Sequence, residues 1–189
     1  PKQLRHITQI ASRVNQQLMH EHDVSSLGER WSYTGNSLFD LSASLTESGD
    51  VISLRDHHRS RSEIIEFSNR HFYEGRLRIA TRESELRVPN GEPAVRWVHV
   101  TGNVVRPSSG GAVNRDEARA VVRELERLLA DQRYEGTVGV VSPFRAQANL
   151  IRDLVNQNDR LLGAIGGSDL LIETVYRFQG DERDVMVFS

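Results

Sequence analysis

Two short apolar runs enclose a polar turn near the end of the sequence, and this pattern constrains the fold most strongly. The runs cover residues 170–175 and 185–188, and their lengths and apolar side chains are typical of buried strands. The turn between them contains Gln179, Gly180 and Glu182. A glycine lets a backbone approach a ligand closely, while the amide and the carboxylate can bind hydroxyl groups. The turn therefore suits a sugar or a phosphate group, although an ordinary turn between two strands has the same pattern.

Strand-like runs alternate with amphipathic helices along the rest of the chain. The most strand-like run is 137–141, and Ser142 and Pro143 after it are expected to cap and begin the next helix. Further short strands are expected at 51–54 and 94–100. This alternation predicts an α/β fold, a parallel sheet with helices on both faces.

Three of the expected helices have clear start signals. Asn36 and Ser37 precede a short apolar helix, and Asn114 precedes a helix with a long apolar stripe. Ser60 and Glu63 have the spacing of a capping box, and Gly75 is expected to end the helix that this box begins. These signals indicate packing elements and not chemistry.

Length and composition describe an ordinary globular chain. Its 189 residues, 38% of them hydrophobic and 26% charged, are enough to bury one core, so one domain over residues 1–189 is expected. No apolar run approaches the roughly 18 residues of a membrane span, and no basic-then-apolar leader is present, so we expect a cytoplasmic protein without membrane contact. The sequence has no cysteine, which excludes disulfides and thiolate metal sites.

The charge pattern excludes two common features. The net charge of −2 gives no basic field over the whole domain, so any nucleic-acid contact must come from a local patch. Lys2 is the only lysine, and it does not stand in a G-x-x-x-x-G-K-[ST] sequence. The chain therefore contains no P-loop.

A polar run, R-D-H-H-R at residues 55–59, lies between the expected strand 51–54 and the helix that begins near Ser60. Open α/β sheets bind ligands at loops of this kind. A solvated turn with two surface histidines fits the pattern as well. The adjacent His57 and His58 would also suit a metal, but no carboxylate or third histidine recurs at ligand spacing, so no metal site is predicted.

The junction after the strand 137–141 has the features of an anion site. First-turn N–H groups and the helix dipole favour a phosphate, and Ser142, Arg145 and Gln147 can add donors. A plain structural cap is the alternative.

Residues 174–189, T-V-Y-R-F-Q-G-D-E-R-D-V-M-V-F-S, resemble motif V of superfamily one helicases. The resemblance is to the branch that contains the nonsense-mediated-decay and Okazaki-fragment helicases, whose pattern is an apolar strand, F-Q-G-x-E, an aspartate and another apolar strand. It implies that Gln179, Gly180 and Glu182 face ATP and that Thr174 faces the nucleic acid.

Three other segments resemble this family in the same order along the chain. L-R-D-H-H-R-S at residues 54–60 is similar to motif IV, L-x-x-N-Y-R-S, which implies that Arg59 is an arginine finger for the γ-phosphate and that His58 replaces the tyrosine near the base. Residues 1–4 resemble the second half of motif III, with Gln3 as the sensor of the terminal phosphate. G-V-V-S-P-F-R-A-Q at residues 139–147 resembles V-x-T-P-Y-x-x-Q, which implies that Ser142, Arg145 and Gln147 contact the nucleic-acid backbone.

The resemblance implies the second, C-terminal RecA-like lobe of a P-loop NTPase motor. Residues 1–45 are expected to connect it to the first lobe. That first lobe is expected to provide most of the contacts that hold ATP and Mg²⁺. Motifs I, II and VI are not found, so we expect a fragment that is inactive alone. The expected partners are that first lobe and a single-stranded nucleic acid, with DNA favoured over RNA.

Ser142, Arg145 and Thr174 are expected to lie along one edge of the sheet and to follow a single strand through its phosphates, while His58, Arg59 and Glu182 face the first lobe. Because all these residues lie at or near predicted strand ends, nucleotide and nucleic acid are expected to share one face of the domain. The alternative function is a non-catalytic domain that responds to nucleotide or binds proteins while retaining the helicase fold.

Overall fold

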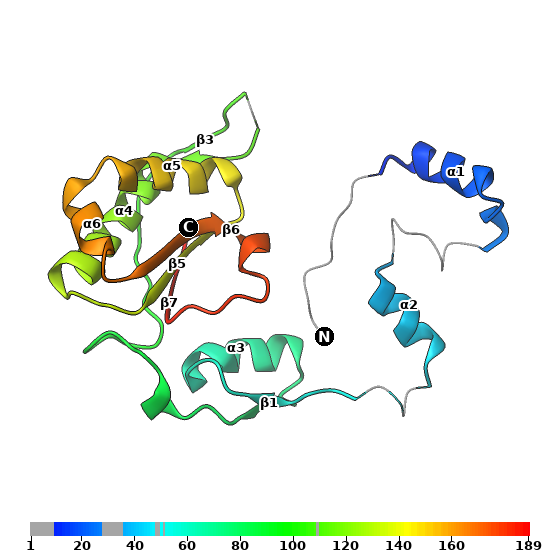
Figure 1. Ribbon diagram of the computed structural model, residues 1–189, viewed down its shortest axis with the longest axis horizontal. Helices are drawn as coiled ribbons and strands as arrows, with labels where there is room; N and C mark the ends of the chain where they lie inside the picture. The colour runs from blue at the N-terminus through cyan, green and yellow to red at the C-terminus, as the bar shows by residue number, and fades with distance from the viewer. Residues whose placement is uncertain (1–9, 28–35, 48–49, 51, 109) are drawn as a thin grey trace. The chain divides into compact units, whose positions relative to one another are not determined.

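A computed structural model describes residues 10–27, 36–47, 50, 52–108 and 110–189 of the chain (Figure 1). Its contacts divide the chain into two compact units, Pro1–Arg55 and Asp56–Ser189. The connecting segment predicted over residues 1–45 lies within the first unit. Among the described residues, every helix is too short or too polar to cross a lipid bilayer.

The first unit contains the helices α1 (Ser12–Glu21) and α2 (Leu38–Leu45) and the single turn η1 (Ser25–Leu27). Ser37 caps α2 as predicted: its hydroxyl accepts a hydrogen bond from the Asp40 N–H at 3.2 Å, and the Asp40 carboxylate accepts one from the Ser37 N–H at 3.0 Å. None of the residues in α1 or α2 is buried within the described part of the chain.

The second unit is built on a parallel sheet of three strands in the order β6-β5-β7. The strands are β5 (Thr137–Ser142), β6 (Asp169–Thr174) and β7 (Val185–Phe188), close to the predicted positions. The predicted strand 170–175 ends one residue early because Val175 begins a single 3₁₀ turn, η5 (Val175–Phe178). The parallel α/β fold is therefore confirmed.

Helices on one face of this sheet form the core. They are α4 (Arg115–Leu125), its π-helical continuation η4 (Glu126–Asp131), α5 (Arg145–Asn156) and α6 (Asp159–Ile165). Alternate strand residues point toward this layer, because successive side chains of a strand face opposite sides. Large side chains that are fully buried in this core include Leu125, Val138, Ile151 and Leu161, and each contributes about 1.5–3 kcal/mol by its removal from water.

The opposite face of the sheet, where helices were also predicted, is covered at β5 by the chain that follows β6. A side chain at Gly139 would point to this face. A Cβ atom at this position would lie 2.5 Å from the Met186 sulfur and 2.8 Å from the Phe178 ring. The next nearest atom belongs to Arg183, at 3.1 Å. A residue without a side chain thus lets Phe178 and Arg183 lie directly against the central strand.

The remaining strands are short and form separate pairs. β1 (Asp56–His57) pairs in parallel with β2 (Arg78–Ile79), and β3 (Val104–Val105) pairs antiparallel with β4 (Val113–Asn114). The strand predicted at 94–100 is absent from these described residues, because its alternate apolar side chains are not buried: Trp97 is 88% exposed.

The strand predicted at 51–54 is not found at that position. Residues 52–54 are exposed coil, residue 51 lies outside the described part, and the strand of this region is β1, at Asp56–His57. β1 leads into α3 (Ser62–Phe72). The N-cap residue of this helix is Arg61, and its side chain makes no capping hydrogen bond. The predicted capping box of Ser60 is therefore wrong, whereas Gly75 ends the helix as expected, with φ +71° and its N–H donating to the Asn69 carbonyl at 2.9 Å.

The close approach at Gly139 generates a stability prediction. Gly139→Ala should destabilise the second unit by about 1–3 kcal/mol, because the methyl group must displace Met186 and Phe178. Gly163→Ala in α6 is the matched control, since no atom lies within 4 Å of its Cβ position and alanine favours a helix by about 1 kcal/mol. Urea unfolding of both variants measures the difference, and equal stability would contradict the packing described for Gly139.

Candidate nucleotide and nucleic-acid site

The loop that follows β1 is fastened at several points. The Ala80 N–H donates to the His57 carbonyl at 2.8 Å, and the Thr81 hydroxyl donates to the Ser60 carbonyl at 2.8 Å. Buried Asn69 of α3 holds the segment that leads into β2, because its side chain accepts from the Leu77 N–H at 2.9 Å and donates to the Leu77 carbonyl at 3.2 Å. The loop therefore has a defined shape at the point where His58 and Arg59 emerge as exposed residues.

The half-buried His57 ring also closes this loop. Its Nε2 lies 3.1 Å from the Ser60 backbone nitrogen and 2.7 Å from the Ser60 hydroxyl. Ser60 thus bonds to His57, which explains why it does not cap α3. Burial lowers the pKa of His57, the charges of Arg59 and His58 lower it further, and Glu182 opposes them.

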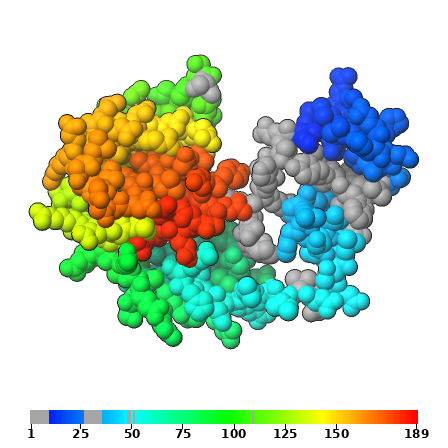
Figure 2. Space-filling view, in the orientation of Figure 1, coloured from blue at the N-terminus to red at the C-terminus, as the bar shows by residue number. Residues whose placement is uncertain are grey.

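Arg59 forms an ion pair with Glu182, so the structure joins two predicted site residues that lie far apart in the sequence. Both side chains are well exposed, 65% for Arg59 and 59% for Glu182. An exposed pair of this kind contributes little to stability, on the order of 0–1 kcal/mol. The pair therefore brings the Arg59 guanidinium and the Glu182 carboxylate together at the surface, and it adds little to the stability of the fold. In Figure 2 the red atoms from the end of the chain lie on the visible face of the second unit.

The turn that carries Glu182 is anchored by two residues that the sequence did not single out. Arg183, with only 11% of its side chain exposed, donates to Asp169 at 2.6 Å and to Asp181 at 2.9 Å. Asp184 accepts hydrogen bonds from the Thr137 N–H at 2.7 Å and the Thr137 hydroxyl at 2.8 Å. The Arg183 hydrogen bond is the largest cause that lowers the pKa of Asp181.

Within this anchored turn, Gly180 has φ +85°, a conformation that favours glycine, and no atom lies within 4 Å of its Cβ position. Gln179 and Gly180 are exposed. The predicted nucleotide residues His58, Gln179, Gly180 and Glu182 are therefore accessible, which their expected role requires. Gln3, the other predicted catalytic residue, lies outside the described residues.

The predicted strand-contacting residues meet at the carboxyl edge of the sheet. Ser142 and Thr174 are register partners at the ends of β5 and β6, and only 1% and 8% of them is exposed. The Ser142 hydroxyl accepts from the Phe144 N–H at 3.2 Å and does not cap α5, whose N-terminal flanking residue is Phe144. Arg145 begins α5 and is exposed.

Gln147 is buried and its side-chain amide is used inside the protein. Its oxygen accepts from the Asn114 N–H at 2.9 Å, and its nitrogen donates to the Asn114 carbonyl at 3.1 Å and the Ser189 hydroxyl at 3.0 Å. It thereby ties α5 to the start of α4, where Asn114 is the predicted cap. Contact of Ser142 and Gln147 with a nucleic acid stays a prediction, and their burial leaves Arg145 as the accessible donor.

The two groups of predicted residues lie at opposite ends of the parallel strands. The turn with Glu182 returns to the amino ends of the strands, because Arg183 bonds to the first residue of β6 and Asp184 to the first residue of β5. Ser142 and Thr174 lie at the carboxyl ends. The reason is that the segment between β6 and β7 must cross the sheet to begin another parallel strand.

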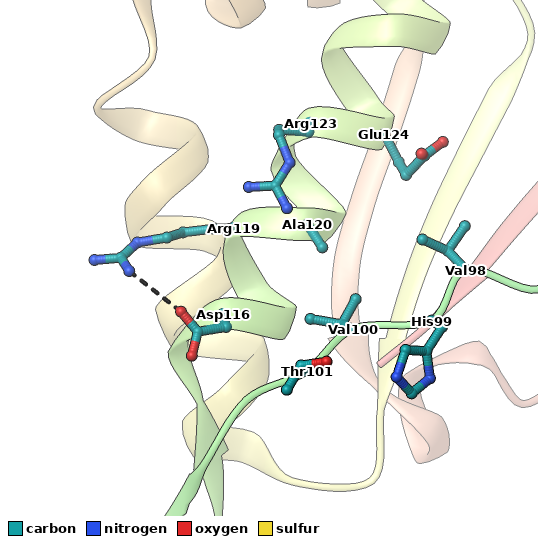
Figure 3. A pocket seen from close by; sticks show the side chains of 9 residues that line it. All are labelled: Val98, His99, Val100, Thr101, Asp116, Arg119, Ala120, Arg123 and Glu124. Atoms are coloured by element: carbon teal, nitrogen blue, oxygen red, sulfur yellow. Dashed lines mark hydrogen bonds and ion pairs between the residues drawn. The ribbon is translucent and has the colours of Figure 1, made fainter.

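A separate cavity of about 350 Å³ lies between residues 98–101 and the exposed side of α4 (Figure 3). Arg119 on its wall pairs with Asp116 at 3.5 Å. The cavity contains none of the predicted site residues, and we assign no role to it. Elsewhere in the described segments, no group of three or more histidine and carboxylate side chains is arranged to hold a metal ion.

Comparison with known proteins defines the class to which this fold and site belong. The AAA domain family matches residues 34–189, which is most of the chain. The chain therefore belongs to this AAA domain family, and its relatives place it in the helicase superfamily, in the branch with the Nam7-type and MOV-10-type helicases.

Three relatives illustrate the similarity. An uncharacterized ATP-dependent helicase of Mycoplasma genitalium is 32% identical over 146 residues, 72% of this chain and 12% of the relative. A putative helicase mov-10-B.2 of Danio rerio is 28% identical over 204 residues, with 100% and 20% covered. The ATP-dependent helicase NAM7 of Saccharomyces cerevisiae is 28% identical over 166 residues, with 81% and 16% covered. The chain thus spans a fifth or less of the length of these relatives.

Proposed function

We propose that this chain is the second, C-terminal motor lobe of an ATP-dependent nucleic-acid helicase. The observation that carries the proposal is the ion pair between Arg59 and Glu182, which brings the segments similar to motifs IV and V to one place on the surface. The names of the relatives, ATP-dependent helicases among them, support this function. The partners are then the first lobe of the same protein and a single-stranded nucleic acid, with DNA favoured over RNA.

The proposed chemistry assigns a role to each exposed group. Arg59 is the arginine finger, because an exposed guanidinium can stabilise the charge that develops on a transferring phosphoryl group. Glu182 and Gln179 offer acceptors for hydroxyl groups of a nucleotide, and the bare Gly180 backbone permits close approach. His58 would lie near the base. Mg²⁺ neutralises phosphate charge in such motors, and the first lobe would hold it together with most of the ATP.

Nucleic-acid contact is assigned to the carboxyl edge of the sheet. Arg145 is exposed at the start of α5, beside the ends of β5 and β6. A helix N-terminus and a guanidinium both favour a phosphate, so this edge would follow the backbone of a strand and not its bases. Without the first lobe, the chain alone should show no ATPase activity, because it has no P-loop lysine.

Arg59→Ala in the full-length protein tests the catalytic assignment. We expect kcat for ATP hydrolysis to fall by about 10³-fold or more, with a smaller effect on nucleotide affinity, because the arginine acts when the γ-phosphate departs. Arg70→Ala is the control, since Arg70 of α3 is also exposed, at 73%, and also ion-paired, with Glu66. An unchanged kcat in Arg59→Ala would contradict the catalytic role of Arg59 and would mean that the resemblance to motif IV is only structural.

Arg145→Ala tests the assignment of the strand. We expect weaker binding of single-stranded DNA. We also expect the slope of log affinity against log salt concentration to be smaller in magnitude by about one. Arg160→Ala removes the same charge from α6, which leads to the amino end of β6, and should leave strand affinity unchanged. Equal effects of the two substitutions in a filter-binding titration would contradict the assignment.

A further inference from the structure

His57 has a defined protonation state in this structure. A backbone N–H can only donate, so the contact of 3.1 Å between the Ser60 nitrogen and His57 Nε2 requires an unprotonated Nε2. The Ser60 hydroxyl, 2.7 Å away, can donate to the same atom. The proton of the neutral ring therefore lies on Nδ1, an assignment that follows from the hydrogen bonds.

The contact between the His57 ring and Ser60 closes the loop that contains Arg59, the residue to which the proposed function gives a catalytic role. His57 and Ser60 are the two ends of a short loop that contains His58 and Arg59. The backbone of both ends is fastened to the segment after β2, by the Ala80 N–H and the Thr81 hydroxyl. The contact between the His57 ring and the Ser60 N–H closes the loop between these anchors. Losing it would leave Arg59 on a chain with fewer fixed points.

We propose that His57 is a positioning residue for Arg59, and that protonation of its ring opens the loop and makes ATP hydrolysis sensitive to acid. This inference rests on the proposed function, because it assumes that Arg59 acts on a phosphoryl group. His57 itself touches no substrate in this account. It acts by holding the backbone on which Arg59 is mounted.

The surroundings of His57 favour the neutral ring. Burial is the largest cause that lowers its pKa, followed by the positive charges of Arg59 and His58. Glu182 is the opposing group, and its carboxylate is neutralised in part by its ion pair with Arg59. For a base with a lowered pKa, the closed loop is fully stable above the ordinary histidine pKa and loses stability as the pH falls through the lowered value.

Two substitutions in the full-length protein test the positioning role. His57→Ala removes the acceptor and should lower kcat by about tenfold to a hundredfold at every pH, with little change in KM, because misplacing a catalytic group by about 1 Å has an effect of this size. His57→Asn keeps an acceptor, since an asparagine oxygen can bond to a backbone N–H a few residues further on. It should retain most of the neutral-pH kcat while losing the decline that the wild type shows below about pH 6.5.

The control is His99→Asn, an equally conservative change at an exposed histidine on the wall of the separate cavity. It should leave both kcat and the pH profile unchanged. A wild-type acid decline in His57→Asn, or full kcat in His57→Ala, would overturn the inference. Arg59→Ala then separates the two possible failures. If Arg59→Ala also keeps full kcat, the proposed function is wrong. If Arg59→Ala is inactive, the proposed function stands and only the role of His57 is wrong.

A spectroscopic measurement tests the geometry without relying on catalysis. Histidine-selective ¹⁵N NMR, with the His57 signal assigned by its loss in His57→Asn, should show an unprotonated Nε2 and a protonated Nδ1 at neutral pH. The ring should titrate below the ordinary histidine pKa of about 6.5. A protonated Nε2 at neutral pH, or an ordinary titration, would overturn the inference whatever the kinetics show.

Discussion

Pairing of β5 with a parallel strand on each side is the constraint on which the positions of the candidate site residues depend. Val138 and Val140 are fully or almost fully buried against the helices, and their burial holds the strand in the core. Between them, Gly139 leaves the other face of the strand flat. The chain after β6 can therefore cross the sheet in contact with it, and the turn that carries Glu182 has a firm support.

Charged residues then hold this crossing chain in place. Arg183 is nearly buried and bonds to two carboxylates, Asp169 and Asp181, so its positive charge is compensated. Asp184 fixes the same turn to the start of β5 through Thr137. The exposed pair of Arg59 and Glu182 has the opposite character, because it contributes little to stability and both groups remain available. Arg183 thus supports the fold, whereas its neighbour Glu182 is exposed and contributes little to stability.

The sequence predicts those parts of the fold that depend on local pattern. The strands at 137–142 and 185–188 were predictable because continuous apolar runs are typical of buried parallel strands, and Asn114 was predictable as a cap from its spacing. The run 94–100 is also rich in apolar residues, although Arg96 and His99 interrupt it, and it has no partner strand among the described residues, so pattern alone overestimates it. Whether a strand forms depends on distant backbone, which a local pattern does not contain.

The site was predictable in part. Family resemblance selected Arg59 and Glu182, and the structure brings them together. Arg183, Asp184 and His57 were missed as structural residues because their partners, Asp169, Thr137 and the Ser60 backbone, are set by tertiary folding. Gln147 shows the reverse error: a polar residue near a helix start suggested a ligand, but buried polar groups usually bond within the protein, and this one does.

The proposed function makes Arg59 the group that stabilises the transferring phosphoryl group, and binding that group would separate its guanidinium from Glu182. A crystal structure of the full-length protein with a single-stranded oligonucleotide, ADP, Mg²⁺ and a fluoride analogue of the transferring phosphate tests it most directly. The account predicts that the Arg59 guanidinium lies within hydrogen-bond distance of the analogue, about 2.7–3.2 Å, and is no longer paired with Glu182. An Arg59 side chain that still contacts Glu182, or that faces solvent while the analogue is bound, would contradict the account.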